Sequence, residues 1–115
     1  MVAHLERLAR NQVLFREVNE RLRELLDERS GTADFLCECS NEECIETVSL
    51  EIAEYERVRS RPNLFVVSRG HEIPAIEKVV HSNGSYVLVE KTEGADYVVR
   101  TDPRGAYQVV QKAAS

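Results

Sequence analysis

Residues 35–48 read Phe-Leu-Cys-Glu-Cys-Ser-Asn-Glu-Glu-Cys-Ile-Glu-Thr-Val and contain all the cysteines of the chain, which are Cys37, Cys39 and Cys44. Two β-prone runs flank the turn-forming residues 41–43, a pattern typical of a β-hairpin. Side chains alternate along a strand, so Cys37 and Cys39 are expected on one face and Glu38 on the other. The turn would return Cys44 beside them. The pattern therefore predicts three thiols on one side of a hairpin.

Three clustered thiols resemble an incomplete zinc site, because structural zinc takes four tetrahedral ligands, mostly thiolates and imidazoles. An odd number of cysteines argues against a disulfide framework. His71 follows Gly70 in a tight turn after a predicted strand, and we expect it to be the fourth ligand; His81 or a carboxylate is the alternative. Cys-x-Cys is a tighter spacing than zinc sites usually have, and the competing interpretations are inert buried thiols and a thiol redox site. The predicted zinc ligands are Cys37, Cys39, Cys44 and His71.

The N-terminal segment predicts a long amphipathic helix over residues 3–28, free of glycine and proline between Leu5 and Leu26. Its apolar residues follow a heptad, with a and d positions occupied by Leu8, Asn11, Phe15, Val18, Leu22 and Leu25. Two interpretations fit this pattern. The helix docks on its own domain, or it pairs with a second copy in a homodimer.

The rest of the chain predicts short elements. A helix would begin at an N-cap Ser49 and stop before Pro62, and Asn83-Gly84 would join strands 76–81 and 86–91 in a hairpin. Further expected elements are strands 64–67 and 95–100 and a short or frayed helix over 107–112.

Together these elements predict an α+β fold: a long N-terminal helix, a small antiparallel β-sheet with a zinc-stapled hairpin, and one short helix. The expected organisation is an amphipathic helix over 1–30, a zinc-binding domain over 31–101 and a tail over 102–115.

Charge is unevenly distributed along the chain. Residues 35–56 carry seven glutamates and no lysine or arginine, against a net charge of -5 for the whole sequence. This balance disfavours general binding to nucleic acid or anionic membranes and suits a cation near the thiols.

A basic cluster of Arg57, Arg59 and Arg61 with Arg69 is expected to be the basic end of a helix, with phosphate contact as the alternative. No run is apolar enough to span a membrane, and the first ten residues do not form a signal peptide, so we expect a cytoplasmic protein.

Several motifs of the chain stand out together: Phe35-Leu36-Cys37-Glu38-Cys39, Cys44, Val48-x-Leu50, Glu54-Tyr55-Glu56-x-Val58-Arg59, Phe65-x-Val67, Gly70-His71-Glu72 and Val87-x-Val89-Glu90-Lys91. They resemble a small family of uncharacterised actinobacterial proteins. The similarity spans about residues 5–104, and its most specific part runs from the cysteines to Gly70-His71-Glu72. Ser68-Arg69 departs from the pattern, which has a small residue and proline before Gly-His. The resemblance supports the ligand set and implies no activity.

Four protein ligands would leave zinc no open position, so we expect a structural site, no catalytic residues and a non-enzymatic regulatory or protein-interaction module. A zinc-thiolate redox sensor and a dimeric DNA-associated regulator are the alternatives. Catalytic zinc would need a general base such as Glu38 or Glu72. We therefore expect Glu38→Gln and Glu72→Gln to change stability and zinc content little.

Overall fold

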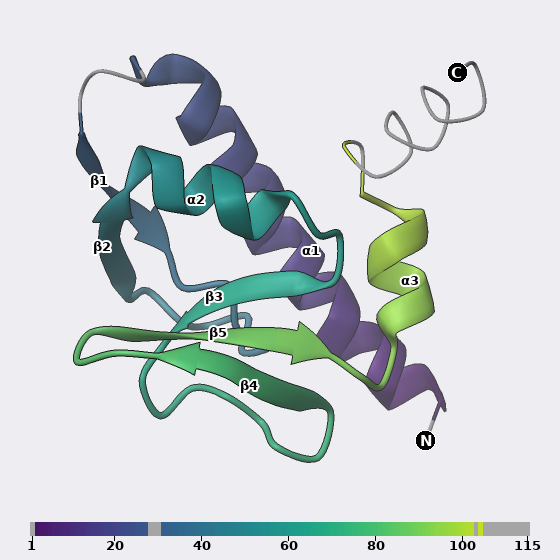
Figure 1. The fold of residues 1–115 in the computed structure, drawn as a ribbon. Helices are drawn as coiled ribbons and strands as arrows, with labels where there is room; N and C mark the ends of the chain where they lie inside the picture. The colour runs from purple at the N-terminus through teal and green to yellow at the C-terminus, as the bar shows by residue number, and fades with distance from the viewer. Residues whose placement is uncertain (1, 28–30, 103, 105–115) are drawn as a thin grey trace.

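The computed structural model describes residues 2–27, 31–102 and 104, and it confirms the α+β class with a long N-terminal helix (Figure 1). In the part of the chain that it describes, the elements follow one another as α1 (Val2–Leu25), β1 (Thr32–Leu36), β2 (Thr47–Glu51), α2 (Ile52–Arg59), β3 (Leu64–Ser68), β4 (Glu77–Ser82), β5 (Tyr86–Lys91) and α3 (Ala95–Arg100).

The strands form two antiparallel sheets where the sequence predicted one. The β1-β2 pair is the predicted hairpin, in which Phe35 lies opposite Val48, and the second sheet has the order β3-β5-β4. The Asn-Gly hairpin between β4 and β5 is also confirmed: Asn83 Oδ1 accepts hydrogen bonds from the backbone N–H groups of Ser85 and Tyr86 at 2.8 and 3.0 Å. Sheets of two and three short strands are marginally stable alone and need to pack against other elements.

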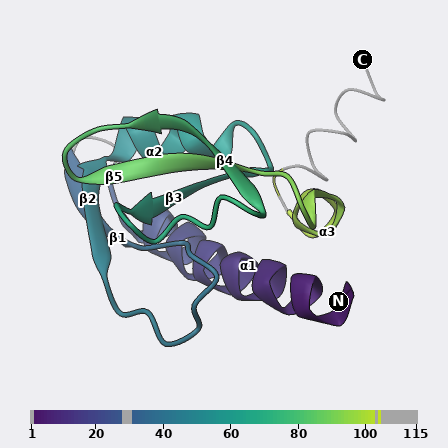
Figure 2. The same cartoon turned by 90° about the horizontal axis from the view of Figure 1, so that it is seen from below.

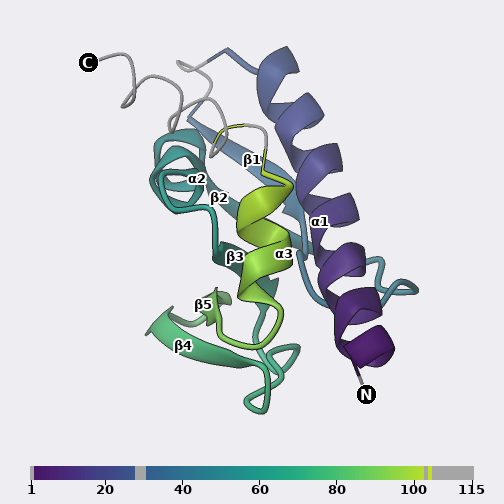
Figure 3. The ribbon, with the colours of Figure 1, turned by 90° about the vertical axis from the view of Figure 1, so that its right-hand side faces the viewer.

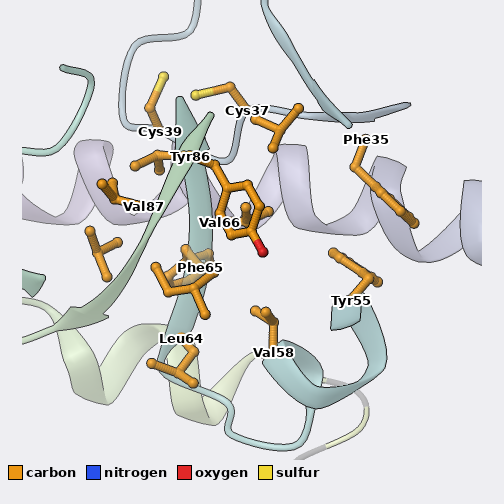
Figure 4. Close-up of a cluster of buried hydrophobic side chains, with 14 of the residues drawn as sticks. Phe35, Cys37, Cys39, Tyr55, Val58, Leu64, Phe65, Val66, Tyr86 and Val87 are labelled. Atoms are coloured by element: carbon orange, nitrogen blue, oxygen red, sulfur yellow. The ribbon is translucent and has the colours of Figure 1, made fainter. Parts of the chain in front are cut away.

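The hydrophobic core lies between β3, the β1-β2 hairpin and α2 (Figure 4). Every residue of β3 is buried, and Phe35 stacks on Tyr55 with ring centroids 4.3 Å apart and planes 10° apart. The inner face of α2 carries Tyr55 and Val58, which are both buried. Its start differs from the prediction, because Ser49 pairs within β2 and the helix begins only at Ile52.

Residues 95–100 form helix α3, so the predicted last strand is wrong. Gly94 adopts a left-handed conformation with φ of 82° directly before the helix, which turns the chain out of β5. Val98 is buried, whereas the next residue, Val99, is exposed. This helix packs beside the N-terminal half of α1 (Figure 3), where a Cβ at position 94 would lie 3.4 Å from the Cβ of Ala9.

The first residue of the predicted tail is part of the interior. Asp102 is buried, and its Oδ1 lies 2.5 Å from Arg59 Nη2 while its Oδ2 lies 4.0 Å from Arg16 Nη1. Two guanidinium groups from different helices thus share one carboxylate. The predicted helix over 107–112 lies outside the described residues.

Helix α1 lies along one edge of the molecule (Figure 2) and packs on its own chain through a face that the heptad did not predict. The heptad residues Val18 and Leu25 are exposed, and Phe15 is only half-buried. The inward face is mostly polar and consists of Ala9, Gln12, Val13, Arg16 and Asn19.

Candidate metal centre

The structure brings together the four residues that the sequence predicted as zinc ligands. The ligand atoms of Cys37, Cys39, Cys44 and His71 all lie within 4.8 Å of one another. His71 Nδ1 is 3.5 Å from Sγ of Cys37 and 3.5 Å from Sγ of Cys44. Tetrahedral bonding to zinc separates a sulfur and a nitrogen ligand by about 3.6 Å. The group therefore has the size of a tetrahedral metal site, and the alternative ligand His81 lies elsewhere, on β4 near Tyr86.

The sequence predicted the cysteines on the two strands of the hairpin. They lie instead in the loop between these strands. The ladder continues one step beyond β1, where the N–H of Cys37 donates to the carbonyl of Glu46 at 3.0 Å. The next N–H, of Glu38, donates at 2.8 Å to the carbonyl of Val66 in β3. The chain thus passes from one sheet to the other, and the sulfurs of Cys37 and Cys39 project from the rim of the core close to each other (Figure 4).

The turn after β3 positions the histidine. The N–H of His71 donates to the carbonyl of Ser68 at 3.0 Å, and Gly70 between them has φ of 89°, a conformation that favours glycine. The N–H of Ser68 donates to Cys37 Sγ at 3.1 Å. One backbone segment therefore carries the imidazole and also holds the sulfur of a cysteine.

Glu46 orients the imidazole from the side away from the thiols. Its Oε2 lies 2.8 Å from Nε2 of His71, which leaves Nδ1 facing the sulfurs. Metal-binding histidines commonly donate their second N–H to a carboxylate in this way. The sequence alone does not reveal this role, because Glu46 is one of several glutamates in the loop and its partner is 25 positions away along the chain.

The metal-free thiols share protons unequally. The hydrogen bond with Cys37 lowers the pKa of Cys39 to about 5. The same hydrogen bond, together with burial, raises the pKa of Cys37, and burial raises the pKa of Cys44. The hydrogen bond with Cys39 raises the pKa of His71, and Glu46 adds to that effect. A divalent cation binding here would replace the protons that remain on the sulfurs.

Glu38, between the first two cysteines, points into the core and is fully buried. Its carboxylate accepts hydrogen bonds from Asn19 Nδ2 at 2.9 Å, Tyr55 Oη at 2.9 Å and the N–H of Val66 at 3.2 Å. Burial raises the pKa of this carboxyl, and the hydrogen bond from Asn19 acts in the opposite direction. The predicted alternation is confirmed, whereas the expectation of a nearly silent Glu38→Gln is at odds with three buried donors.

The polar inward face of α1 binds the backbone at the end of β1 and in the loop that follows it. Asn19 Nδ2 donates to the carbonyl of Leu36 at 2.9 Å, and its Oδ1 accepts from the N–H of Leu36 at 2.8 Å. In the loop, Asn11 Nδ2 donates to the carbonyl of Ser40 at 2.8 Å. Side-chain amides of α1 thus satisfy backbone groups that β2 does not reach.

The arginines of the predicted basic cluster do not form a shared surface. Arg57 pairs with Glu54, Arg61 pairs with Glu90, and Arg59 is buried against Asp102. The guanidinium of Arg69 donates to the carbonyl of Asn83 at 2.8 Å. This arrangement gives the DNA-binding alternative no support.

None of the helices in the described residues combines the length and apolarity needed to cross a membrane. No protein-family model, curated protein or solved structure matches the chain. The similarity to actinobacterial proteins therefore stays a prediction, and the site's own chemistry is the basis for a function.

Proposed function

We propose that the protein is a non-enzymatic regulatory or protein-interaction module built around a structural zinc ion bound by Cys37, Cys39, Cys44 and His71. The observation that carries this proposal is the convergence of three sulfurs and one imidazole nitrogen within 4.8 Å, with Glu46 holding the second imidazole nitrogen.

The donor set favours zinc among the common metals. Magnesium and calcium prefer oxygen ligands, whereas three thiolates and an imidazole in a tetrahedral arrangement are typical of structural zinc sites. Iron-sulfur clusters usually take four cysteines, and the described chain offers three.

The same donor set supports a structural rather than a catalytic role. Four protein ligands fill the tetrahedron, and three thiolates give the zinc site a net charge of about −1, which makes the metal a poor Lewis acid. Both candidate bases accept hydrogen bonds from other parts of the chain, which supports the structural role. Glu38 is directed into the core, and Glu72 Oε1 accepts a hydrogen bond from the N–H of Gly70 at 2.8 Å.

A metal here would add to the hydrogen bonds by which Cys37 and Glu38 already contact β3. The loop between β1 and β2 would be tied to the turn that follows β3, so the two small sheets would be held together at one end. Metal binding energy contributes directly to folding when the site forms only in the folded chain.

Elemental analysis of the protein as purified tests the proposal. We expect about one zinc per chain. Cys44→Ser and His71→Ala should lower both zinc content and melting temperature, whereas the neighbouring Glu72→Gln should retain both. A folded, metal-free protein whose three thiols react freely with a thiol reagent would refute the proposal.

A zinc-thiolate redox sensor is the second candidate, because Cys44 is only half-buried and lies beside two other sulfurs. Peroxide would oxidise two thiolates to a disulfide: the O–O bond breaks, an S–S bond forms, two protons are taken up and two waters and Zn²⁺ leave. Release of zinc with formation of one disulfide by mass spectrometry would support this role. Zinc that stays bound under peroxide would exclude it.

A further inference from the structure

The three sulfurs of the metal centre differ in how far solvent reaches them. Cys37 and Cys39 are 1% and 2% exposed, whereas Cys44 is half-buried. Glu43 and Ile45, the residues on either side of Cys44, are both exposed. A zinc-bound cysteine is a thiolate, and the thiolate is the form that reacts with oxidants. Because all three would be thiolates, access selects Cys44 as the one that a small oxidant reaches.

Cys37 and Cys39 lie close together but are poorly placed to form a disulfide with each other. The N–H of Glu38 between them donates to the carbonyl of Val66 at 2.8 Å, and its side chain is buried on the opposite side of the chain. Alternate residues of an extended chain are about 6.6 Å apart, whereas the Cβ atoms of a disulfide are about 4 Å apart. A Cys37–Cys39 disulfide would therefore bend the backbone at Glu38 and strain its bonds to the core.

The turn over residues 40–43 brings Cys44 back toward Cys39. The N–H of Cys44 donates to the carbonyl of Asn41 at 3.0 Å, and Asn41 Oδ1 accepts from the N–H of Glu43 at 3.0 Å. The sulfurs of the centre lie within 4.8 Å of one another. A disulfide brings two sulfurs to about 2.0 Å, and the exposed residues 41–43 can supply this movement.

Cys37 is held by the end of β3. Its Sγ accepts a hydrogen bond from the buried N–H of Ser68 at 3.1 Å, and its own N–H donates to the carbonyl of Glu46 at 3.0 Å. Oxidation of Cys37 would replace a thiolate acceptor with a disulfide sulfur, which is a weak one. The N–H of Ser68 would then lose most of its hydrogen bond, so Cys39 is the better partner for Cys44.

We propose that Cys44 is the site at which hydrogen peroxide modifies the zinc centre, and that it then forms a disulfide with Cys39 while Cys37 remains a thiol. The Cys44 thiolate attacks peroxide: an S–O bond forms, the O–O bond breaks and hydroxide leaves. The Cys39 thiolate attacks the sulfur of this sulfenic acid: an S–S bond forms, the S–O bond breaks and a second hydroxide leaves. Each sulfur gives up one electron to the peroxide, and two protons from solvent convert the hydroxides to water.

The disulfide removes two of the four metal ligands. Cys37 and His71 alone do not complete the tetrahedron of a structural zinc site, so the ion is released. The loop over residues 37–46 is then no longer joined through the metal to the turn that carries His71. This proposal rests on the proposed zinc site and assigns residues to its redox role.

Differential labelling of the purified full chain tests the pairing. Zinc is measured first, and an equimolar amount of hydrogen peroxide is added. Free thiols are blocked with iodoacetamide, disulfides are reduced, and the new thiols receive a heavy form of the same reagent. Tandem mass spectrometry reads the label on each cysteine. We expect the light label on Cys37, the heavy label on Cys39 and Cys44, and about one zinc released per disulfide.

The outcomes separate this proposal from the zinc site itself. A protein that carries no zinc before peroxide overturns both. A zinc-loaded protein that shows any other pattern of labels, or that keeps its zinc under peroxide, overturns only the pairing of Cys44 with Cys39.

Limited alkylation tests the order of reaction. A small amount of iodoacetamide, added to the zinc-loaded protein without peroxide, should label Cys44 at least about tenfold faster than Cys37 or Cys39. The control is the same protein in urea with a chelator, where the three thiols should react at similar rates. Equal labelling of the three cysteines in the folded, zinc-loaded protein overturns Cys44 as the site of modification.

Discussion

Glu38→Gln probes the link between the cysteine loop, residues 37–46, and the core more directly than any change to a cysteine or to His71. The side chain keeps its shape but loses one acceptor, because an amide presents an oxygen on one side and an N–H on the other. Glu38 now accepts from three donors, two at Oε2 (Asn19 and Tyr55) and one at Oε1 (Val66).

Either orientation of the new amide leaves at least one buried donor facing another donor. With the amide nitrogen at the Oε1 position, the N–H of Val66 loses its acceptor. With the amide nitrogen at the Oε2 position, Asn19 Nδ2 faces another donor but keeps its bond to the carbonyl of Leu36. The Tyr55 hydroxyl must then rotate to accept from the new amide. A buried donor without a partner costs about 1–3 kcal/mol, so we expect Glu38→Gln to lower the free energy of unfolding by about 2 kcal/mol.

Urea denaturation of the zinc-loaded protein measures this loss, with zinc content determined on the same samples. Glu72→Gln is the control, because its carboxylate accepts only near the surface, and we expect it within about 0.5 kcal/mol of the original. A double-mutant cycle with Tyr55→Phe should show coupling, since the tyrosine and glutamate share a hydrogen bond. Equal stability of Glu38→Gln and Glu72→Gln, or loss of zinc from Glu38→Gln without loss of stability, would refute this reasoning.

Two further changes test the groups around the centre. Glu46→Gln weakens the acceptor that orients His71 and should lower zinc affinity about tenfold, measured by competition with a chromophoric chelator. The control is Glu42→Gln, at an exposed carboxyl of the same loop, and equal affinities of the two variants would contradict the role of Glu46. Asp102→Asn leaves two buried guanidinium groups without their shared carboxylate and should lower the free energy of unfolding, measured by urea denaturation, by about 3 kcal/mol. Asp96→Asn, on an exposed side chain, is the control and should lower it very little. Similar losses of stability in the two variants would contradict the role of Asp102.

The parts of the fold that the sequence predicted correctly depend on short spacings. Asn83-Gly84 fixes a hairpin through contacts within four residues. The three cysteines lie in one short loop, and His71 follows the turn at Gly70, so each part of the site is local in the sequence. The wrong elements depended on distant neighbours. Residues 95–100 are β-prone by composition, but Gly94 and the packing of Val98 against the core favour a helix.

The same distinction explains why the site was only partly predicted. Its ligands carry a recognisable donor chemistry, whereas Asn19 and Tyr55 are ordinary residues of two helices until the fold brings them to Glu38. A heptad count gives no weight to an asparagine whose partners lie 17 and 19 positions away. For this reason the sequence predicted the wrong inward face of the first helix.

The polar inward face of α1 follows from the backbone groups that it meets in the rest of the chain. The carbonyls of Leu36, Glu38 and Ser40 accept hydrogen bonds from the side-chain amides of Asn19, Gln12 and Asn11. Buried carbonyls need such donors, and these three positions of the helix are therefore polar. A leucine at position 19 would add apolar surface to the interior, but it would remove both hydrogen bonds to Leu36 and one of the three that the Glu38 carboxylate accepts. The polar inner face of α1 thus supports the segment that brings the cysteines together.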